Sequence, residues 1–371
     1  MTHRFLHSSD LHLGKSFGGF PEGVRNRLRE ARHGSIARLA AAARAGGTDQ
    51  VLLAGDTFDA ETPAPDTLRH ALRAMAEASD ISWVMIPGNH DSLAASELWR
   101  RIANDTPPNL CAVKDPQPLE IKPGLWLLPA PCTQRRPGRD LTEAMSAPTP
   151  EGARRVGLGH GAVIDFSGEE GTQGIIPPDR ARLSGLDYLA LGDWHGCLQI
   201  GPATWYSGTP EGDSFKHVGC ASALLVDLGS AQKVTPVSTG EFGWLRPELD
   251  LLPGDDPAAQ LSAALPPVSG RRDLLLRLAA RGRLALSDLA ALQGARDAAS
   301  PDFGWFDCDL AALSAETLPA DLDQIDHGGA LRQAAEALLV ETTDPALTTA
   351  ARGVAAAALS RLYALAQEVH A

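Results

Sequence analysis

The sequence has few cysteines and no long run of apolar residues. Its five cysteines are Cys111, Cys132, Cys197, Cys220 and Cys308. No two of them form a C-x-x-C pair, which argues against a zinc ribbon or a disulfide framework and favours a reducing compartment. The start of the chain lacks the apolar core of a signal peptide, and no stretch is long enough to span a bilayer. We therefore expect a cytoplasmic protein with no membrane partner.

The sequence also has fewer basic than acidic residues. It contains 33 Lys and Arg residues and 46 Asp and Glu residues, which gives a net charge of −13. Phosphate backbones are normally met by basic surfaces, so this balance is a caution against a nucleic-acid substrate. Acidic residues that bind metal ions would reverse the field locally, however. Charge therefore leaves the substrate class open.

The first half of the chain alternates short apolar runs with helix-like stretches. Strands are predicted at residues 4–9, 50–54 and 82–86, and helices at residues 22–45, 65–78 and 94–102. This order predicts a largely parallel sheet covered by helices, with catalytic residues in loops beyond the carboxyl ends of the strands. Further strands are predicted at residues 125–129, 155–159, 188–191, 196–200, 204–207 and 221–228.

A composition change marks a candidate domain boundary in the second half. Residues 247–270 contain five prolines together with Gly and Asp, which is typical of a linker. We therefore expect one domain over residues 1–246 and a small α/β domain over residues 247–327. The Ala- and Leu-rich residues 328–371 should form a helical C-terminal segment.

Five polar clusters follow predicted strands: D-L-H, G-D-T-F-D, P-G-N-H-D, G-H-G and G-D-W-H-G. Their candidate metal ligands are Asp10, His12, Asp56, Asn89, His160, Asp193 and His195. Mixed Asp, His and Asn ligands suit Mn²⁺, Fe or Zn²⁺. The i, i+2 spacing directs two side chains the same way from an extended segment. Any one of these residues is as readily a turn, a helix cap or a core histidine, but five clusters in this order favour one metal site.

Several other residues are open to two interpretations. Asp59 and Asp91 either orient metal ligands or cap the helices that follow them. Strand alternation places Trp194 in the core, opposite to its two neighbours. The residues proposed to line a substrate groove are Tyr206, Ser207 and Gly208.

Two basic runs are either solvated surface or contacts to DNA. The first run lies in the long predicted helix and the second in a Pro-rich loop. They consist of Arg25, Arg27, Arg29 and Arg32, and of Arg135, Arg136 and Arg139.

The ordered clusters resemble those of the calcineurin-like metallophosphoesterase superfamily. The fuller strings H-S-S-D-L-H-L-G, A-G-D-T-F-D and I-P-G-N-H-D resemble its SbcD/YhaO branch of DNA repair exonucleases, as does W-Y-S-G-T-P-E at residues 205–211. The resemblance implies a four-layer α/β/β/α sandwich with a small α/β capping domain and a helical C-terminus. It also implies DNA as substrate and a coiled-coil ATPase similar to SbcC as partner. Members of the family are often homodimers.

The same resemblance implies roles for the clustered residues. Asp10, His12 and His195 would hold one divalent metal ion. Asn89, His160 and Asp193 would hold a second, with Asp56 bridging the two. His90 would face the scissile phosphate as a proton donor or transition-state stabiliser.

One position departs from the family pattern. The usual G-H-x-H is replaced by Gly192-Asp193-Trp194-His195, so a third carboxylate joins Asp10 and Asp56. We expect this to favour Mn²⁺ over Zn²⁺, with Mg²⁺ and Fe as further candidates. In the alternative, Asp193 points away from the site and activity is lost.

Three functions remain open at this point. The first is a metal-dependent nuclease acting on DNA ends. The second is a phosphodiesterase or phosphatase for a small-molecule or protein phosphate ester. The third is a weakly active scaffold subunit for the ATPase.

Overall fold

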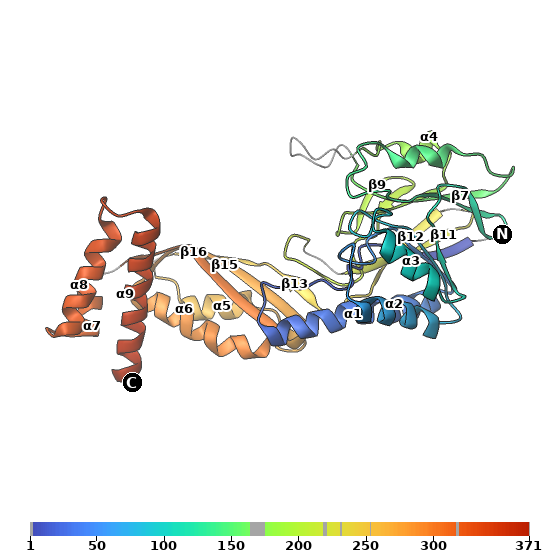
Figure 1. Cartoon of the computed structure of the whole chain (residues 1–371). Helices are drawn as coiled ribbons and strands as arrows, with labels where there is room; N and C mark the ends of the chain where they lie inside the picture. The colour runs from blue at the N-terminus through green and yellow to red at the C-terminus, as the bar shows by residue number, and fades with distance from the viewer. Residues whose placement is uncertain are drawn as a thin grey trace. The chain divides into compact units, whose positions relative to one another are not determined.

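The computed structural model describes residues 3–163, 175–217, 221–230, 232–252, 254–316 and 319–370. The chain divides into two compact units, Met1–Gly243 and Trp244–Ala371. The first unit contains two six-stranded sheets with helices outside them (Figure 1). The second contains a smaller sheet and the C-terminal helices.

The first sheet has the order β12-β11-β1-β2-β3-β4. Its parallel strands are β1 (His3–Ser8), β2 (Gln50–Leu53), β3 (Ser82–Met85) and β4 (Leu110–Ala112). Two antiparallel strands extend it, β11 (Ser222–Leu228) and β12 (Gln232–Ser238). The helices that connect the parallel strands are α1 (Glu22–Ala45), α2 (Pro65–Glu77) and α3 (Ser96–Asp105).

The second sheet has the order β5-β6-β7-β8-β10-β9. Its parallel strands are β6 (Leu125–Ala130), β7 (Arg154–His160), β8 (Tyr188–Gly192) and β10 (Thr204–Tyr206). Antiparallel strands close both edges, β5 (Leu119–Lys122) and β9 (Leu198–Gly201). The segments on its outer side include the 3-10 helix η1 (Leu141–Ser146) and the short helix α4 (Arg180–Leu183).

Strand alternation divides the core of this unit into layers. Leu6 and Val51 pack with Leu39 of α1 on the helix side of the first sheet. Their strand neighbours Phe5 and Leu52 face the other way and pack against the second sheet. Strands that are buried on both faces read as continuous apolar runs, which is the pattern seen in β2. A third apolar cluster lies between the outer face of the second sheet and η1 and α4.

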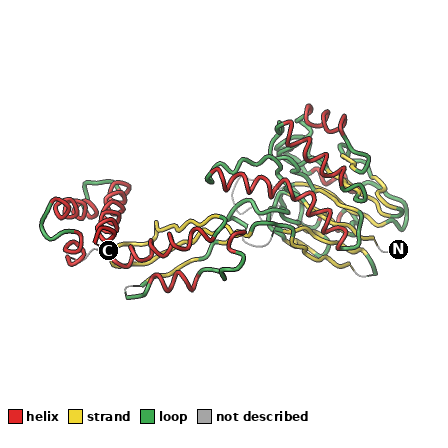
Figure 2. The backbone as a smooth tube through the Cα atoms, turned by 90° about the horizontal axis from the view of Figure 1, so that it is seen from below, coloured by secondary structure: helices red, strands yellow, loops and turns green. Residues whose placement is uncertain are grey.

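The resulting order is helix, sheet, sheet, helix, so the predicted α/β fold class with largely parallel sheets is confirmed. The two predicted strands at residues 50–54 and 82–86 appear almost unchanged as β2 and β3. Figure 2 shows the helices lying outside the strands in this unit.

The second unit is built on two long strands. Its strands are β13 (Gly243–Leu245), β14 (Glu248–Leu251), β15 (Leu274–Ala285) and β16 (Trp305–Glu316). Two helices, α5 (Pro257–Ala264) and α6 (Leu286–Ala299), cover this sheet through an apolar cluster. Asp256 caps α5 by accepting hydrogen bonds from the backbone of Ala258 and Ala259.

Three C-terminal helices form a separate apolar cluster in this unit, α7 (Pro319–Ile325), α8 (Ala330–Thr343) and α9 (Thr349–His370). Among the described residues of the whole chain, no helix is both long and apolar enough to cross a membrane.

Candidate metal centre

The predicted ligands meet where the carboxyl ends of the parallel strands converge. Asp10 follows β1, Asp56 follows β2 and Asn89 follows β3. His160 is the last residue of β7, and the Asp193–His195 loop follows β8. Both sheets therefore supply side chains to one edge of the first unit, which is the usual place for a site in an α/β fold.

The loops that carry these residues are sharply turned rather than extended. Asp10, His12, Asp56 and Asp193 have φ angles of 55°, 43°, 51° and 103°. The expectation that i, i+2 pairs lie on extended segments is therefore wrong. Left-handed backbone at non-glycine residues costs about 1–3 kcal/mol and concentrates at functional sites. Backbone hydrogen bonds between the loop after β1 and the loop after β2 hold these turns, because Asp10 N donates to Gly55 O and His12 N donates to Asp56 O.

The same turn corrects the prediction for Trp194. Because Asp193 has a positive φ, strand alternation does not apply, and the Trp194 side chain is not in the core. It is 42% exposed, and its ring packs edge-on to His217 with centroids 4.6 Å apart.

The first group of donor atoms comes from Asp10, His12 and His195. The two Nε2 atoms of His12 and His195 are 3.2 Å apart. Asp10 Oδ1 lies 3.9 Å from the first and 3.8 Å from the second. These three atoms form one compact cluster that is suited to a metal ion.

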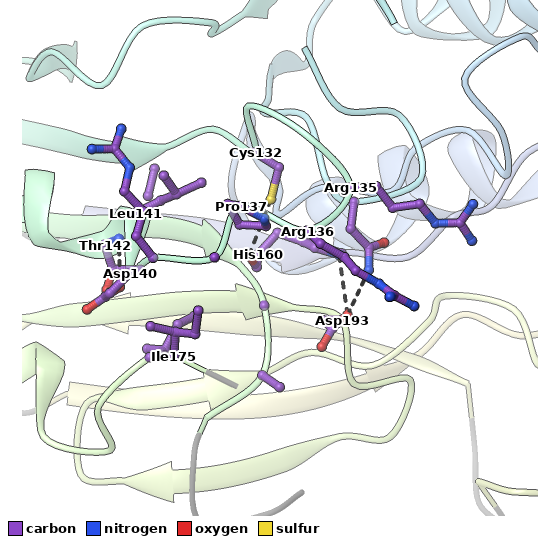
Figure 3. A pocket seen from close by; sticks show the side chains of 17 residues that line it. Cys132, Arg135, Arg136, Pro137, Asp140, Leu141, Thr142, His160, Ile175 and Asp193 are labelled. Atoms are coloured by element: carbon purple, nitrogen blue, oxygen red, sulfur yellow. Dashed lines mark hydrogen bonds and ion pairs between the residues drawn. The ribbon is translucent and has the colours of Figure 1, made fainter. Parts of the chain in front are cut away.

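A second group of donors comes from Asp56, Asn89, His160 and Asp193. His160 Nε2 lies 3.4 Å from Asp56 Oδ2 and 3.8 Å from Asp193 Oδ1. The amide nitrogen of Asn89 is 3.3 Å from Asp193 Oδ1. Asp193 therefore points into the site, as Figure 3 shows.

Asp56 belongs to both groups. Its Oδ2 atom lies 3.6 Å from His12 Nε2 of the first group and 3.4 Å from His160 Nε2 of the second. Its other oxygen accepts a hydrogen bond of 2.8 Å from His90 N, which fixes the carboxylate.

The donor set fits divalent metal ions. Ligand bonds of about 2.0–2.2 Å place neighbouring donors about 3–3.6 Å apart, which is close to the separations found in both groups. Among the described residues, His160 Nε2 and Asn89 Oδ1 are buried and have no hydrogen-bond partner. Buried polar atoms without partners are uncommon unless an ion or water satisfies them. Both atoms belong to the second donor group.

Each of the three histidines is held through its other ring nitrogen. His160 Nδ1 lies 2.8 Å from Ala54 O, and His195 Nδ1 lies 2.9 Å from Asp213 Oδ2. His12 Nδ1 lies 3.1 Å from Asp59 Oδ1. When Nδ1 carries the proton, Nε2 presents its lone pair to the centre, an arrangement typical of metal-ligating histidines.

Asp213 is a residue that the sequence prediction missed. It is buried, contacts His195, and lies 2.8 Å from Lys15 Nζ. Burial raises the pKa of the Asp213 carboxyl, but His195, Arg32 and Lys15 outweigh this and hold it well below its usual range. No spacing rule links Asp213 to His195. In the sequence Asp213 is only marked as an acidic residue that follows Glu211 and Gly212.

The predicted residues Asp59 and His90 lie at the edge of the first donor group. The Asp59 backbone oxygen is 2.9 Å from His90 Nδ1, so one residue contacts both His12 and His90. The rings of His12 and His90 are edge-on, with centroids 4.8 Å apart. His90, His12 and Asp56 form a further set of atoms close enough to share an ion.

Asp91 ties two loops of the site together. Its buried carboxylate accepts hydrogen bonds of 3.0 Å from Phe58 N and 2.7 Å from Gly88 N. Burial and the nearby charge of Asp56 raise the pKa of Asp91 to about 7.

The ionisable side chains of the centre shift the pKa values of one another. Burial opposes ionisation of Asp56, but the neighbouring His160 and His12 hold the pKa of Asp56 below its usual range. Burial likewise lowers the pKa of His160, but Asp56 and Asp10 outweigh it, so the pKa of His160 is raised. Burial and the carboxylates of Asp10 and Asp56 raise the pKa of Asp193. Carboxylates crowded in this way favour a bound cation.

Arg32 is neither solvated surface nor a DNA contact, so both interpretations of this residue are wrong. It is 1% exposed and donates from Nη1 to Leu11 O at 2.6 Å and from Nη2 to Glu211 O at 2.8 Å. It therefore joins the loop of Asp10 to the loop before Asp213. Arg29, one turn earlier in α1, is exposed.

The three residues predicted to line a substrate groove are buried. Tyr206 is buried and its hydroxyl donates to Gly161 O at 2.7 Å. Ser207 is buried and its hydroxyl is 3.0 Å from that of Ser9. Gly208 has a φ of 74°, and an added Cβ would lie 2.8 Å from His195 O.

Gly88 is required by the close approach of Asp56. An added Cβ would lie 2.1 Å from Asp56 Oδ1 and 2.4 Å from Asp56 N. We expect Gly88→Ala to displace this carboxylate and to weaken Mn²⁺ binding about 10–100-fold. Isothermal titration of metal-free protein with Mn²⁺ measures the change. Gly294→Ala, where an added Cβ meets nothing within 4 Å, should bind like the wild type. Unchanged affinity in the Gly88 variant would contradict this packing.

Comparison with known families agrees with this geometry. Residues 3–140 match the calcineurin-like phosphoesterase family. The matched segment contains Asp10, His12, Asp56 and Asn89, whereas His160 and the Asp193–His195 loop lie beyond it. This segment is therefore similar to calcineurin-like phosphoesterases, and it supplies several of the atoms that could hold a metal ion.

A curated relative and a solved structure are also similar to this chain. The relative is the "Uncharacterized metallophosphoesterase YhaO" of Bacillus subtilis (strain 168), 29% identical over 240 residues. The aligned part is 60% of this chain and 57% of that protein, so the chain spans little more than half the length of this relative. The structure is the crystal structure of TT1561 of Thermus thermophilus, at 14% identity and a TM-score of 0.42. It aligns with 64% of this chain and 100% of its own.

Proposed function

We propose that this chain hydrolyses phosphodiesters with two divalent metal ions that share Asp56 as a ligand. The observation that carries the proposal is the position of Asp56 Oδ2, 3.6 Å from His12 Nε2 and 3.4 Å from His160 Nε2. The first ion would take Asp10, His12 and His195, and the second Asn89, His160 and Asp193. Both donor groups come from loops at one edge of the sheets.

Ions bound at these residues would polarise the phosphate and lower the pKa of an attacking water. The protein itself supplies orientation. Asp59, Ala54 and Asp213 hold the three histidines with Nε2 facing inward. Asp91 fixes Gly88 N, and the adjoining loop places His90 N on Asp56. Such pre-positioned ligands need little rearrangement during the reaction.

His90 is proposed to donate a proton to the leaving oxygen. The contact of its Nδ1 with Asp59 O fixes the ring beside His12 and leaves Nε2 as the atom available for proton transfer. Histidine suits this role because its usual pKa lies near neutral pH.

We propose a DNA end as the substrate, and a nuclease acting in DNA repair as the function. The support is the resemblance of the D-L-H, G-D-T-F-D and G-N-H-D strings to the SbcD/YhaO branch. The test is an assay with Mn²⁺ on linear duplex DNA beside bis-p-nitrophenyl phosphate. Cleavage of both is expected. Hydrolysis of the small ester with intact DNA would overturn the nuclease proposal, and activity on neither, matching His90→Ala, would favour a scaffold.

Mn²⁺ is the proposed native ion, because three carboxylates of Asp10, Asp56 and Asp193 converge and harder ions prefer oxygen ligands. We expect Asp193→His to raise the zinc content relative to manganese. Metal analysis after exposure of both proteins to equal Mn²⁺ and Zn²⁺ measures this. Equal zinc content in wild type and variant would contradict the preference.

We also propose that a coiled-coil ATPase resembling SbcC binds the C-terminal helices. Support comes from exposed apolar side chains around a cavity of about 760 Å³ between α7, α8 and α9, among them Leu331, Leu365 and Val369. Leu365→Asp should weaken binding to the purified ATPase, whereas Val354→Asp, outside this cavity, should not. Equal binding by both variants would place the partner elsewhere.

A further inference from the structure

A cavity of about 500 Å³ adjoins the second donor group. Its lining includes Asn89, His160 and Asp193 together with the loop at residues 135–142. Figure 3 shows His160 and Asp193 beside this loop. This volume lies within the range of small-molecule sites and is large enough for a nucleotide. A phosphate held at the donor groups would therefore have space beside it for one attached group.

Three arginines of the loop line this cavity: Arg135, Arg136 and Arg139. All three are largely solvent-accessible, and within the described part of the chain none of their guanidinium groups forms an ion pair or a hydrogen bond. The acidic neighbour Asp140 is already paired, because Arg180 Nη2 lies 2.5 Å from its Oδ2. The loop therefore presents uncompensated positive charge in a chain whose net charge is −13.

The rest of the wall is largely apolar. Its apolar members are Ala130, Pro137, Leu141, Ala162, Ile175 and Ile176. Arginine is the side chain that best matches phosphate oxygens, and an apolar wall suits the sugar and base of a nucleotide. A site of this kind is typical of a ligand that carries both a flat ring system and an anionic group.

We propose that the cavity binds the nucleoside attached to the scissile phosphate, and that Arg135, Arg136 and Arg139 bind the next phosphate along the same strand. This assignment rests on the proposed phosphodiesterase function. It makes the preferred substrate an oligonucleotide with at least two phosphates rather than an isolated phosphate ester.

The dinucleotide TpT, which has one phosphate, tests the proposal against pTpT and TpTp, which add a terminal phosphate. We expect kcat/KM with Mn²⁺ to be at least about tenfold higher for pTpT or TpTp than for TpT. The triple variant Arg135→Ala, Arg136→Ala, Arg139→Ala should bring that ratio close to one. Its rate on bis-p-nitrophenyl phosphate should stay within about twofold of wild type. Arg136→Lys, which keeps the charge, should retain part of the preference.

The control variant removes three exposed arginines from α2 and α3: Arg69→Ala, Arg73→Ala and Arg100→Ala. It should keep the wild-type ratio, which separates a local effect from a change in net charge. Calorimetric binding of the three dinucleotides to the wild type and both triple variants gives a readout that needs no hydrolysis. Equal binding of TpT, pTpT and TpTp, or a preference that survives the loop variant, would overturn the proposal. If the wild-type protein does not hydrolyse bis-p-nitrophenyl phosphate, that result would instead contradict the proposed function.

Discussion

Asp56→Ala is expected to abolish hydrolysis of bis-p-nitrophenyl phosphate, with a loss of roughly 10³-fold or more in kcat. Asp56 Oδ2 lies 3.6 Å from His12 Nε2 of the first donor group and 3.4 Å from His160 Nε2 of the second. Its removal takes a ligand from each group and leaves His160 without its nearest negative charge. Steady-state kinetics with saturating Mn²⁺ measures the loss.

Asp66→Ala is the matched control, because this carboxylate is 93% exposed on α2. It should hydrolyse the ester at the wild-type rate and should bind Mn²⁺ equally well. An Asp56→Ala protein that keeps more than about a tenth of the wild-type kcat would show that the shared carboxylate is not central to the chemistry.

Arg32→Met is expected to lower the free energy of unfolding of the first unit by about 3 kcal/mol or more. The variant loses the hydrogen bonds from Arg32 to Leu11 O and Glu211 O, although Glu211 O keeps the hydrogen bond from the Thr209 hydroxyl. It also removes one of the positive charges that, together with His195 and Lys15, stabilise the Asp213 carboxylate. Urea denaturation of the metal-free protein measures the change.

Arg29→Met controls for the same substitution one turn away on an exposed face of α1. It should alter stability by no more than about 0.5 kcal/mol. Comparable stability of the two variants would mean that Arg32 does not hold the loops of Asp10 and Glu211 together.

Much of the fold follows from patterns that the sequence states directly. Apolar runs such as residues 50–54 and 82–86 have no polar face, so they predict strands buried on both sides. Their alternation with helix-like segments predicts parallel pairing and places the following polar residues at one edge. The positions of Asp56 and Asn89 near one another follow from this alone.

The local geometry of the centre does not follow from such patterns. The side chains of Asp10, His12 and Asp193 converge because their backbones adopt positive φ, which sequence periodicity does not encode. The exposure of Trp194 is a consequence of the same turn.

Contacts between residues far apart in the chain also cannot be predicted from the sequence patterns. His195 is oriented by Asp213, and Arg32 contacts the oxygen of Glu211, 179 residues away. These contacts depend on how loops from different strands pack. A charged residue in an amphipathic helix gives no sign that it is buried, and the two interpretations of Arg32 failed for that reason.

The proposed chemistry depends on two metal ions that share Asp56 as a ligand. The most direct measurement is the number of Mn²⁺ ions bound per chain, obtained by calorimetric titration of metal-free wild type and Asp56→Ala. We expect two ions per wild-type chain and clearly fewer in the variant. A single ion per wild-type chain, or two ions in both proteins, would contradict it.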